Sequence, residues 1–216
     1  MRSVFALVLG FALVACGAKT EEAKPETEAV KIDPRVAAEQ AKAKELADAL
    51  APQKPEFDAA RAANDEAKID DLADAGNGWA LLHRGQTRLS SQDFSQQQGG
   101  FHDMEAAAEK GVAEAQFWLG TKMAYGRDGY QLKPNSGLMM MERAARQGHL
   151  QAIMAVGLMY EQDTFMSDKK KAREWYQKGV ELGSEDAKNA LKRMDGGAAP
   201  DTGNAETGEE KAAEPL

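Results

Sequence analysis

Apolar and small residues recur along the chain at a fixed distance from four glycines. Gly76, Gly111, Gly148 and Gly183 are separated by 35, 37 and 35 residues. An apolar residue precedes each glycine by seven positions and another by three. The members of these two columns are Ile69, Met104, Met141 and Tyr176, and then Ala73, Ala108, Ala145 and Val180. Because residues three or four positions apart share one face of an α-helix, each glycine is predicted to follow the end of an amphipathic helix.

The residues after each glycine predict that another helix follows the turn. An alanine follows four positions later in every copy, and a glycine follows nine positions later in all but the last. These residues are Ala80, Ala115, Ala152 and Ala187, and then Gly85, Gly120, Gly157 and Lys192. Small side chains at such positions let two helix backbones approach closely. The pattern predicts an all-α solenoid of helix pairs over residues 65–194, in which Lys192 marks a terminal helix that faces water.

The residues before the repeats predict two further helices over 34–64. Asp33 and Pro34 are typical of a helix start, and the helix must stop near Pro52. Pro52 and Pro55 bracket a break, after which residues 56–64 are expected to form a short helix. Residues 90–100 and 127–135 are expected to be loops between the helices of the repeats.

The repeat segments resemble a known family. The runs AAEKGVAEAQFWLG at 107–120 and AARQGHLQAIMAVGLMY at 144–160 are similar to Sel1-like repeats, relatives of the tetratricopeptide (TPR) repeat, and 172–183 resembles the second helix of that unit. The resemblance is strong over 102–194 and weaker over 66–90. It implies a right-handed α-solenoid used for protein–protein contact, and it does not imply catalysis. Many family members join repeats by paired cysteines, whereas this chain has a single cysteine, so packing alone is expected to stabilise it.

The N-terminus has the sequence pattern of a secretion signal. Residues 1–15 combine a basic start with an apolar run that is shorter than the roughly 20 residues of a membrane-spanning helix, which predicts a signal peptide. The segment from Leu13 to Cys16 resembles the lipobox of bacterial lipoproteins, which implies lipidation of Cys16 and acylation, for example with palmitate, of the new N-terminus. An ordinary signal with an incidental cysteine is the alternative. Gly17 after the cysteine resembles the outer-membrane class of Gram-negative lipoproteins, with the folded domain in the periplasm.

Charge divides the chain into three parts. The whole chain carries 27 Lys and Arg against 35 Asp and Glu, but residues 76–194 are nearly neutral and the flanking segments are acidic. A nucleic-acid binder needs a basic stripe, which this distribution does not provide. Residues 16–33, rich in Lys, Glu, Thr and Ala, are expected to form a flexible tether, and residues 195–216 a disordered acidic tail.

Candidate chemistry is sparse, so no catalytic residue, metal site or cofactor is predicted. His83, His102 and His149 occupy different repeat positions, and His149 follows a repeat glycine, where a role in the turn is expected. A Gly-x-Gly at Gly76 follows a helix instead of a strand, which argues against nucleotide binding. Two alternatives stay open: an envelope hydrolase acting on peptidoglycan or a small molecule, and a copper carrier that uses some of the ten methionines.

The expected function is binding of an envelope protein or peptide of unknown identity. In related helical repeats the first helix of each pair lines the concave face, and aromatic and Met side chains are favoured in interface cores. The resemblance and the columns together place eight partner-binding residues on this face: Trp79, Leu82, His83, Phe117, Trp118, Tyr125, Met154 and Leu158. For Trp79, Phe117 and Trp118, packing in the core or between repeats is the alternative. The sequence therefore predicts a lipid-anchored scaffold or adaptor whose repeats present a groove.

Overall fold

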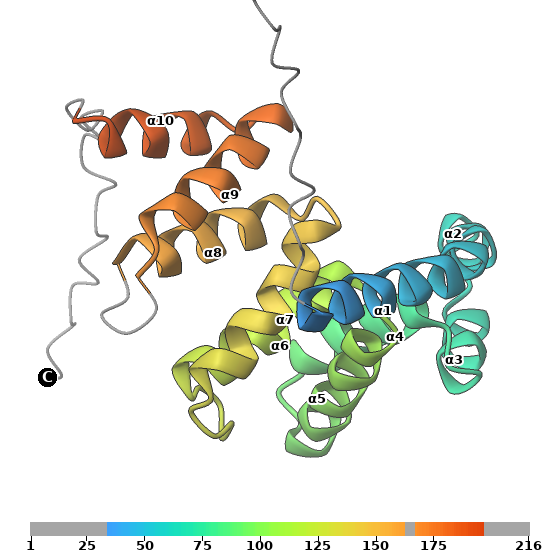
Figure 1. Cartoon of the computed structure of the whole chain (residues 1–216). Helices are drawn as coiled ribbons and strands as arrows, with labels where there is room; N and C mark the ends of the chain where they lie inside the picture. Colours follow the sequence, from blue (N-terminus) through green and yellow to red (C-terminus); the bar gives the residue numbers. More distant parts are fainter. Residues whose placement is uncertain (1–33, 163–166, 197–216) are drawn as a thin grey trace, which may run out of the picture.

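The computed structural model describes residues 34–162 and 167–196. The proposed signal peptide, Cys16, the tether and most of the acidic tail lie outside the described residues. The described part is built from helices alone (Figure 1). They are α1 (Pro34–Leu50), the 3₁₀ turn η1 (Ala51–Gln53), α2 (Lys54–Ala62), α3 (Glu66–Asp74), α4 (Gly78–Leu89), α5 (Phe94–Glu109), α6 (Ala113–Tyr125), α7 (Pro134–Arg146), α8 (Leu150–Gln162), α9 (Lys169–Glu181) and α10 (Glu185–Met194). Within the described ranges, none of these helices combines the length and apolarity needed to cross a bilayer.

Consecutive helices pair into stacked hairpins. Helix α4 packs along α5, α6 along α7, and α8 along α9, and each hairpin also contacts the next one in sequence order. Helix α10 closes the series against α9, and its Lys192 is exposed, as the sequence predicts for a terminal helix. Figure 1 shows this progression from α4 and α5 through α6 and α7 to α10. The predicted all-α solenoid of helix pairs is confirmed.

The four repeat glycines form the turns that join one hairpin to the next. Their φ angles are 82°, 96°, 86° and 83° in chain order, a left-handed conformation that residues with a Cβ rarely adopt. The residue after each glycine directly precedes the first residue of the following helix. Asn77 accepts hydrogen bonds from the backbone N–H groups of Trp79 and Ala80, and Ser184 accepts one from Ala187. The turns therefore follow from the local sequence of each copy.

Close backbone approach holds each hairpin together. The alanine four positions after each repeat glycine is fully buried in all four copies. In the hairpin of α8 and α9, a Cβ at Gly157 would lie 2.5 Å from the Tyr176 ring, so the tyrosine fills the space that the glycine leaves. The corresponding contact between α4 and α5 joins Gly85 to Met104. The column of glycines nine positions after a repeat glycine thus faces, across each hairpin, the column of apolar residues seven positions before the next repeat glycine.

A further column of small residues was missed in the sequence. Gly100, Gly137 and Ala172 stand eleven positions before the second, third and fourth repeat glycines, and all three are buried. A Cβ at Gly137 would meet backbone atoms of α6, 2.6 Å from the carbonyl oxygen of Gly120 and 2.5 Å from the amide nitrogen of Ala124. The second helix of a hairpin therefore contributes a small residue to the contact as well as the first.

Three predicted boundaries differ from the structure. Residues 90–100 were expected to be a loop, but α5 begins at Phe94, because Asp93 caps the helix by accepting a hydrogen bond from the Gln96 amide. The expected loop at 127–135 ends earlier, since Pro134 takes the first turn of α7. The short helix expected at 56–64 spans Lys54–Ala62 instead, because Pro55 is tolerated in its first turn.

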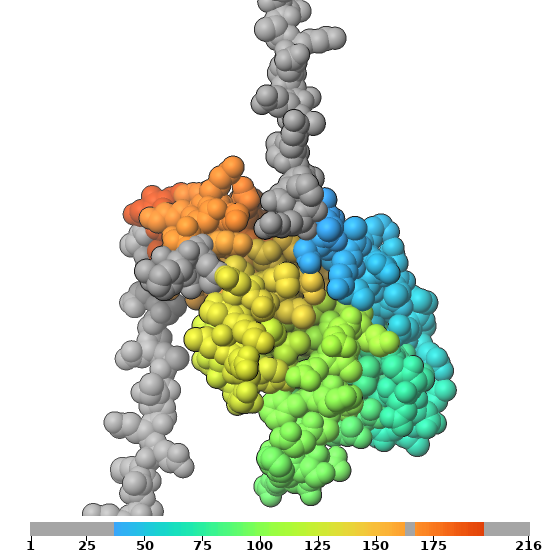
Figure 2. Space-filling view, turned by 60° about the horizontal axis from the view of Figure 1, so that its bottom comes forward, coloured from blue at the N-terminus to red at the C-terminus, as the bar shows by residue number. Residues whose placement is uncertain are grey.

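Helix α1 lies across the edge of the solenoid. Its Leu50 approaches Gly78 at the start of α4, and its Leu46 approaches the turn at Gly111. Nearer the start of α1, Glu39 accepts hydrogen bonds from Arg143 of α7 at 2.6 and 3.0 Å. Arg143 itself is buried. Figure 2 shows α1 (blue) against the green and yellow helices. The N-terminal helix thus bridges two successive repeats.

Candidate binding site

A cavity of about 450 Å³ lies where the first helices α4, α6 and α8 meet the side chain of Met104 from α5. Its apolar lining comes from Leu89, Met104, Phe117 and Trp118. Its polar lining comes from Gln86, Glu114, Thr121, Lys122 and Gln151. The cavity therefore combines an apolar part of its lining, called the floor, with amide, hydroxyl and charged groups, called the rim.

The repeat pattern explains why these side chains converge. Glu114 and Gln151 both stand three positions after a repeat glycine, and Gln86 and Thr121 both stand ten positions after one. Positions three, six, seven and ten of a helix share one face. Phe117 occupies position six of its copy and Trp118 position seven. Stacking the copies therefore aligns one face of each first helix around the cavity.

The two aromatic residues of the floor also pack in opposite directions. Phe117 contacts His149, with ring centroids 5.0 Å apart and ring planes tilted by 33°, and packs on the C-terminal core. Trp118 packs on the N-terminal core, with ring centroids 5.8 Å from Phe101 and 6.2 Å from Tyr130. Both side chains are only half-buried. They belong to the contacts between repeats and still present part of their surface to the cavity.

Hydrogen bonds hold the rim in place. Gln86 Nε2 donates to Glu114 Oε1 at 2.6 Å, which links α4 to α6, and Thr121 Oγ1 donates to the carbonyl oxygen of Phe117. Lys122 places its ammonium 5.4 Å from the centroid of the Trp118 ring and pairs with Asp128. Gln151 is exposed. The rim thus offers hydrogen-bonding groups beside an apolar floor.

The other predicted contact residues lie outside this cavity. Trp79 packs against the N-terminal core with Lys54 over its ring at 5.3 Å, and its Nε1 is buried without a hydrogen-bond partner among the described residues. Leu82 is buried, and His83 lies against Phe57, 3.5 Å from a carboxylate oxygen of Glu66.

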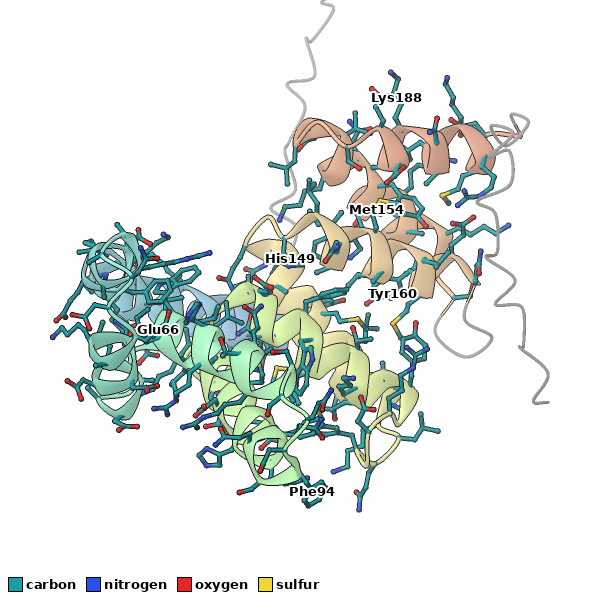
Figure 3. All side chains as sticks on the ribbon, turned by 180° about the vertical axis from the view of Figure 1, so that it is seen from behind. Glu66, Phe94, His149, Met154, Tyr160 and Lys188 are labelled. Carbon is teal, nitrogen blue, oxygen red and sulfur yellow. The ribbon has the colours of Figure 1, made fainter. Side chains whose placement is uncertain are left out.

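Tyr125 is half-exposed at the end of α6, beneath Arg127. Met154 is half-buried on α8 (Figure 3). Leu158, on the same helix, is exposed. Of the eight predicted residues, the structure therefore brings Phe117 and Trp118 into this cavity. A partner role for the others stays a prediction.

Sequence reasoning missed Leu89 and Lys122 as lining residues and assigned Met104 to the core alone. Leu89 lies at the end of α4 and Lys122 directly follows Thr121, and neither stands in one of the repeating columns. No signal in a single copy distinguishes them from surface residues. They enter the site because α4, α5 and α6 converge.

His149 contacts Phe117 beside the cavity, and its protonation affects the stability of the fold. It follows the turn glycine, as predicted, and its Nδ1 accepts a hydrogen bond from the backbone N–H of Ala152 at 3.2 Å. Burial lowers the pKa of His149 below the ordinary 6.5, while the nearby Glu114 opposes that shift. Protonated Nδ1 could no longer accept this bond. The folded state therefore favours the neutral imidazole.

We expect the chain to lose stability as the pH falls through 6.5, because below it the unfolded state binds a proton that folded His149 resists. The change His149→Ser should reduce this loss, since Ser184 caps α10 at the equivalent position. Melting temperatures between about pH 7.5 and pH 5.5 measure the effect, because this range spans the ordinary titration of histidine. An identical pH profile in the two proteins would contradict this role.

The methionines and acidic residues bear on the alternative chemistries. Met104 and Met141 are buried against the glycine columns of their hairpins, and Met159 is buried in the C-terminal core. Within residues 34–162 and 167–196, no group of three or more His, Cys, Asp or Glu side chains is arranged to hold a metal ion. For these three methionines, core packing explains the position.

Comparison with known proteins identifies similar folds. No protein-family model and no curated protein matches the chain. A solved Sel1 repeat protein from Oxalobacter formigenes is similar with a TM-score of 0.54 and 29% identity, over 59% of this chain and 96% of that one. A protective antigen present in uropathogenic Escherichia coli strains, which displays an SLR fold, is similar with a TM-score of 0.53 and 21% identity, over 75% of this chain and 36% of that one. This chain thus spans about a third of the antigen, and that likeness concerns the fold alone.

Proposed function

The chain is a Sel1-like repeat protein, and from that premise we propose that it binds a segment of another protein in the cavity between α4, α6 and α8. The observation that carries the proposal is the half-buried pair Phe117 and Trp118 at the floor of a cavity with a polar rim. Interface cores are enriched in such aromatic anchors, and polar groups surround them.

The chemistry of the lining defines the class of partner. An apolar side chain of the partner fits the floor, because Leu89, Phe117 and Trp118 offer no competing charge there. The amides of Gln86 and Gln151 can donate to and accept from a peptide backbone. The proposed function is therefore that of an interaction scaffold, and the proposal assigns no reaction to the site.

Photocrosslinking in intact cells tests the cavity. A photoreactive residue in place of exposed Gln86 is expected to trap a discrete protein adduct. Adding Gln151→Trp, which fills the opening from α8, should reduce that adduct about tenfold, the effect of a lost hot-spot contact. The matched control is Gln177→Trp, which places the same side chain on the exposed surface of α9. Equal adduct yield in both tryptophan variants would contradict the proposal.

We further propose that the protein is held in the envelope by lipid on Cys16, with residues 1–15 removed and the domain in the periplasm at the outer membrane. The lipobox-like segment before Cys16 supports this, and the composition of 16–33 supports a flexible tether. Attachment at one end raises the local concentration of the repeats near membrane-bound partners. Each buried acyl methylene contributes about 0.8 kcal/mol, so several chains give a stable anchor.

The change Cys16→Ser tests the anchor. It removes the only thiol of the chain, so the protein should remain unlipidated, keep its signal and migrate as a larger species. Metabolic labelling with a palmitate analogue and fractionation of detergent-free membranes measure both effects. Unchanged labelling and processing in Cys16→Ser would overturn the lipid proposal and leave the cavity proposal intact.

A further inference from the structure

A second cavity, of about 480 Å³, lies on the side formed by the second helices α7 and α9 and the end of α8. Its main lining residues are Glu142, Arg146, Tyr160, Lys171, Trp175 and Lys178. Figure 3 labels Tyr160 on α8. This cavity has no lining residue in common with the one between α4, α6 and α8.

Three cationic groups lie over the aromatic rings of this cavity. The Arg146 guanidinium carbon is 5.9 Å and the Lys178 Nζ is 5.4 Å from the centroid of the Trp175 ring. Lys171 Nζ lies 5.0 Å from the centroid of the Tyr160 ring. Aromatic faces partly offset the charge of a cation, but they do not replace a carboxylate.

The carboxylates of the cavity leave this positive charge incompletely balanced. Glu142 is engaged on both oxygens, since it accepts from Arg146 at 2.7 Å and from the Tyr160 hydroxyl at 2.6 Å. Glu174, the remaining acidic lining residue, is largely exposed and 4.0 Å from Lys170. Of the lining residues, three are cationic and two acidic, which leaves one positive charge.

Lys178 is the least compensated of the three cations. Its Nζ donates to the backbone carbonyl of Arg146 at 3.3 Å, and no carboxylate of the described residues forms an ion pair with it. Lys171, by comparison, lies 3.8 Å from Asp168. Burial and the neighbouring Arg146 lower the pKa of Lys178, with Glu181 opposing them. An anion bound in the cavity would favour the charged form of Lys178 and so oppose both effects.

We propose that this cavity binds a carboxylate attached to an apolar group, of the kind found on an acidic or carboxyl-terminal peptide residue. Lys178 and Lys171 supply donors to the carboxylate, and the Trp175 ring contacts the apolar part. The single excess positive charge matches a monoanion, whereas a phosphate dianion would leave the cavity negative. The site is independent of the proposed function of the first cavity.

Titration of the full chain with N-acetylphenylalanine tests the site. The probe carries one carboxylate beside an aromatic ring, and its amide, N-acetylphenylalaninamide, is the uncharged control. NMR should place the shifted backbone amides on α7 and α9. Lys178→Met should weaken binding about tenfold, since it removes a charge-assisted hydrogen bond and keeps the apolar stem. Lys188→Met, which removes a lysine from the exposed face of α10, should leave binding unchanged.

Further arms distinguish the sources of the anion. Lys171→Met is a second variant at an exposed position, and it should weaken binding even if Lys178→Met alters the fold. A chain ending at Gly196, which lacks the acidic side chains of 197–216, should bind the probe more tightly if those side chains compete for the cavity and equally if they do not. Weaker binding by this shorter chain would count against the proposal. Equal affinity for the amide, equal loss in Lys188→Met, or tighter binding of inorganic phosphate or phosphatidylglycerol vesicles would overturn the proposal.

Discussion

The change Asp103→Ala is expected to lower the free energy of unfolding by about 3–5 kcal/mol, because it leaves two arginines without their buried partner. Arg84 donates to both carboxylate oxygens of Asp103, at 2.9 and 3.0 Å, and Arg88 donates at 2.7 Å. The Asp103 side chain is 3% exposed and that of Arg84 is 12% exposed. The hydrogen bonds that Arg84 donates to Asp103 raise the pKa of Arg84, so the guanidinium stays charged.

A second carboxylate on the same arginine provides the control. Asp74 accepts from Arg84 Nη1 at 2.6 Å but is largely exposed, so Asp74→Ala removes a contact that water can replace. Its effect should be much smaller than that of Asp103→Ala. Urea denaturation followed by far-ultraviolet circular dichroism measures both. Equal losses would show that burial of the Asp103 carboxylate is not what makes the network sensitive.

The change Gly137→Ala is expected to lower the free energy of unfolding by about 3 kcal/mol, at the upper end of the usual cost of overpacking. The added methyl group would meet three backbone atoms of α6. It would lie 2.5 Å from the amide nitrogen of Ala124, 2.6 Å from the carbonyl oxygen of Gly120 and 2.7 Å from the Cα of Ala124. Backbone atoms within a helix cannot rotate away as a side chain can. The α6 and α7 axes would therefore have to separate along their whole contact.

Gly99→Ala is the matched control, with the opposite sign. Gly99 also lies inside a helix, but the nearest atoms to its added Cβ belong to the Arg88 side chain, at 3.4 Å or more. Alanine should therefore stabilise α5 by about 0.5–1 kcal/mol through its helix propensity. Thermal and urea unfolding of the two single variants test the pair. Destabilisation of similar size in both variants would contradict the assignment of the Gly137→Ala effect to its close contact with the α6 backbone.

The sequence was sufficient to predict the helix pairs because each copy repeats the same local requirements. The turn needs a left-handed residue, and glycine occurs there in all four copies; the first helix needs a small residue four positions later, and alanine occurs there in all four. Because each requirement occurs four times, the pattern predicts the helix pairs more reliably than the helix propensity of any one segment does. The column of Gly100, Gly137 and Ala172 carries the same kind of signal and could have been found in the same way.

The candidate site was only partly predictable. The position of Phe117 and Trp118 on the first helix follows from the period, and both line the cavity. The period cannot say in which direction each ring turns, because that depends on the space left by His149 on one side and by Phe101 and Tyr130 on the other. Leu89 and Lys122 entered the site through the packing of neighbouring helices. The start of α5 at Phe94 was missed because its cap, Asp93, lies in a polar run that resembles a loop.

The sequence by itself determined the kind of element, the length of the repeat and the residues at each turn, since these depend on backbone sterics and on helix faces within about 40 positions of the chain. Only the tertiary structure decided which residues meet across copies. The pairing of Glu39 with Arg143, the arginines around Asp103 and both cavities join residues from different helices. Their geometry depends on the stacking angle between helices, which is set by the sum of many side-chain volumes and by no single position.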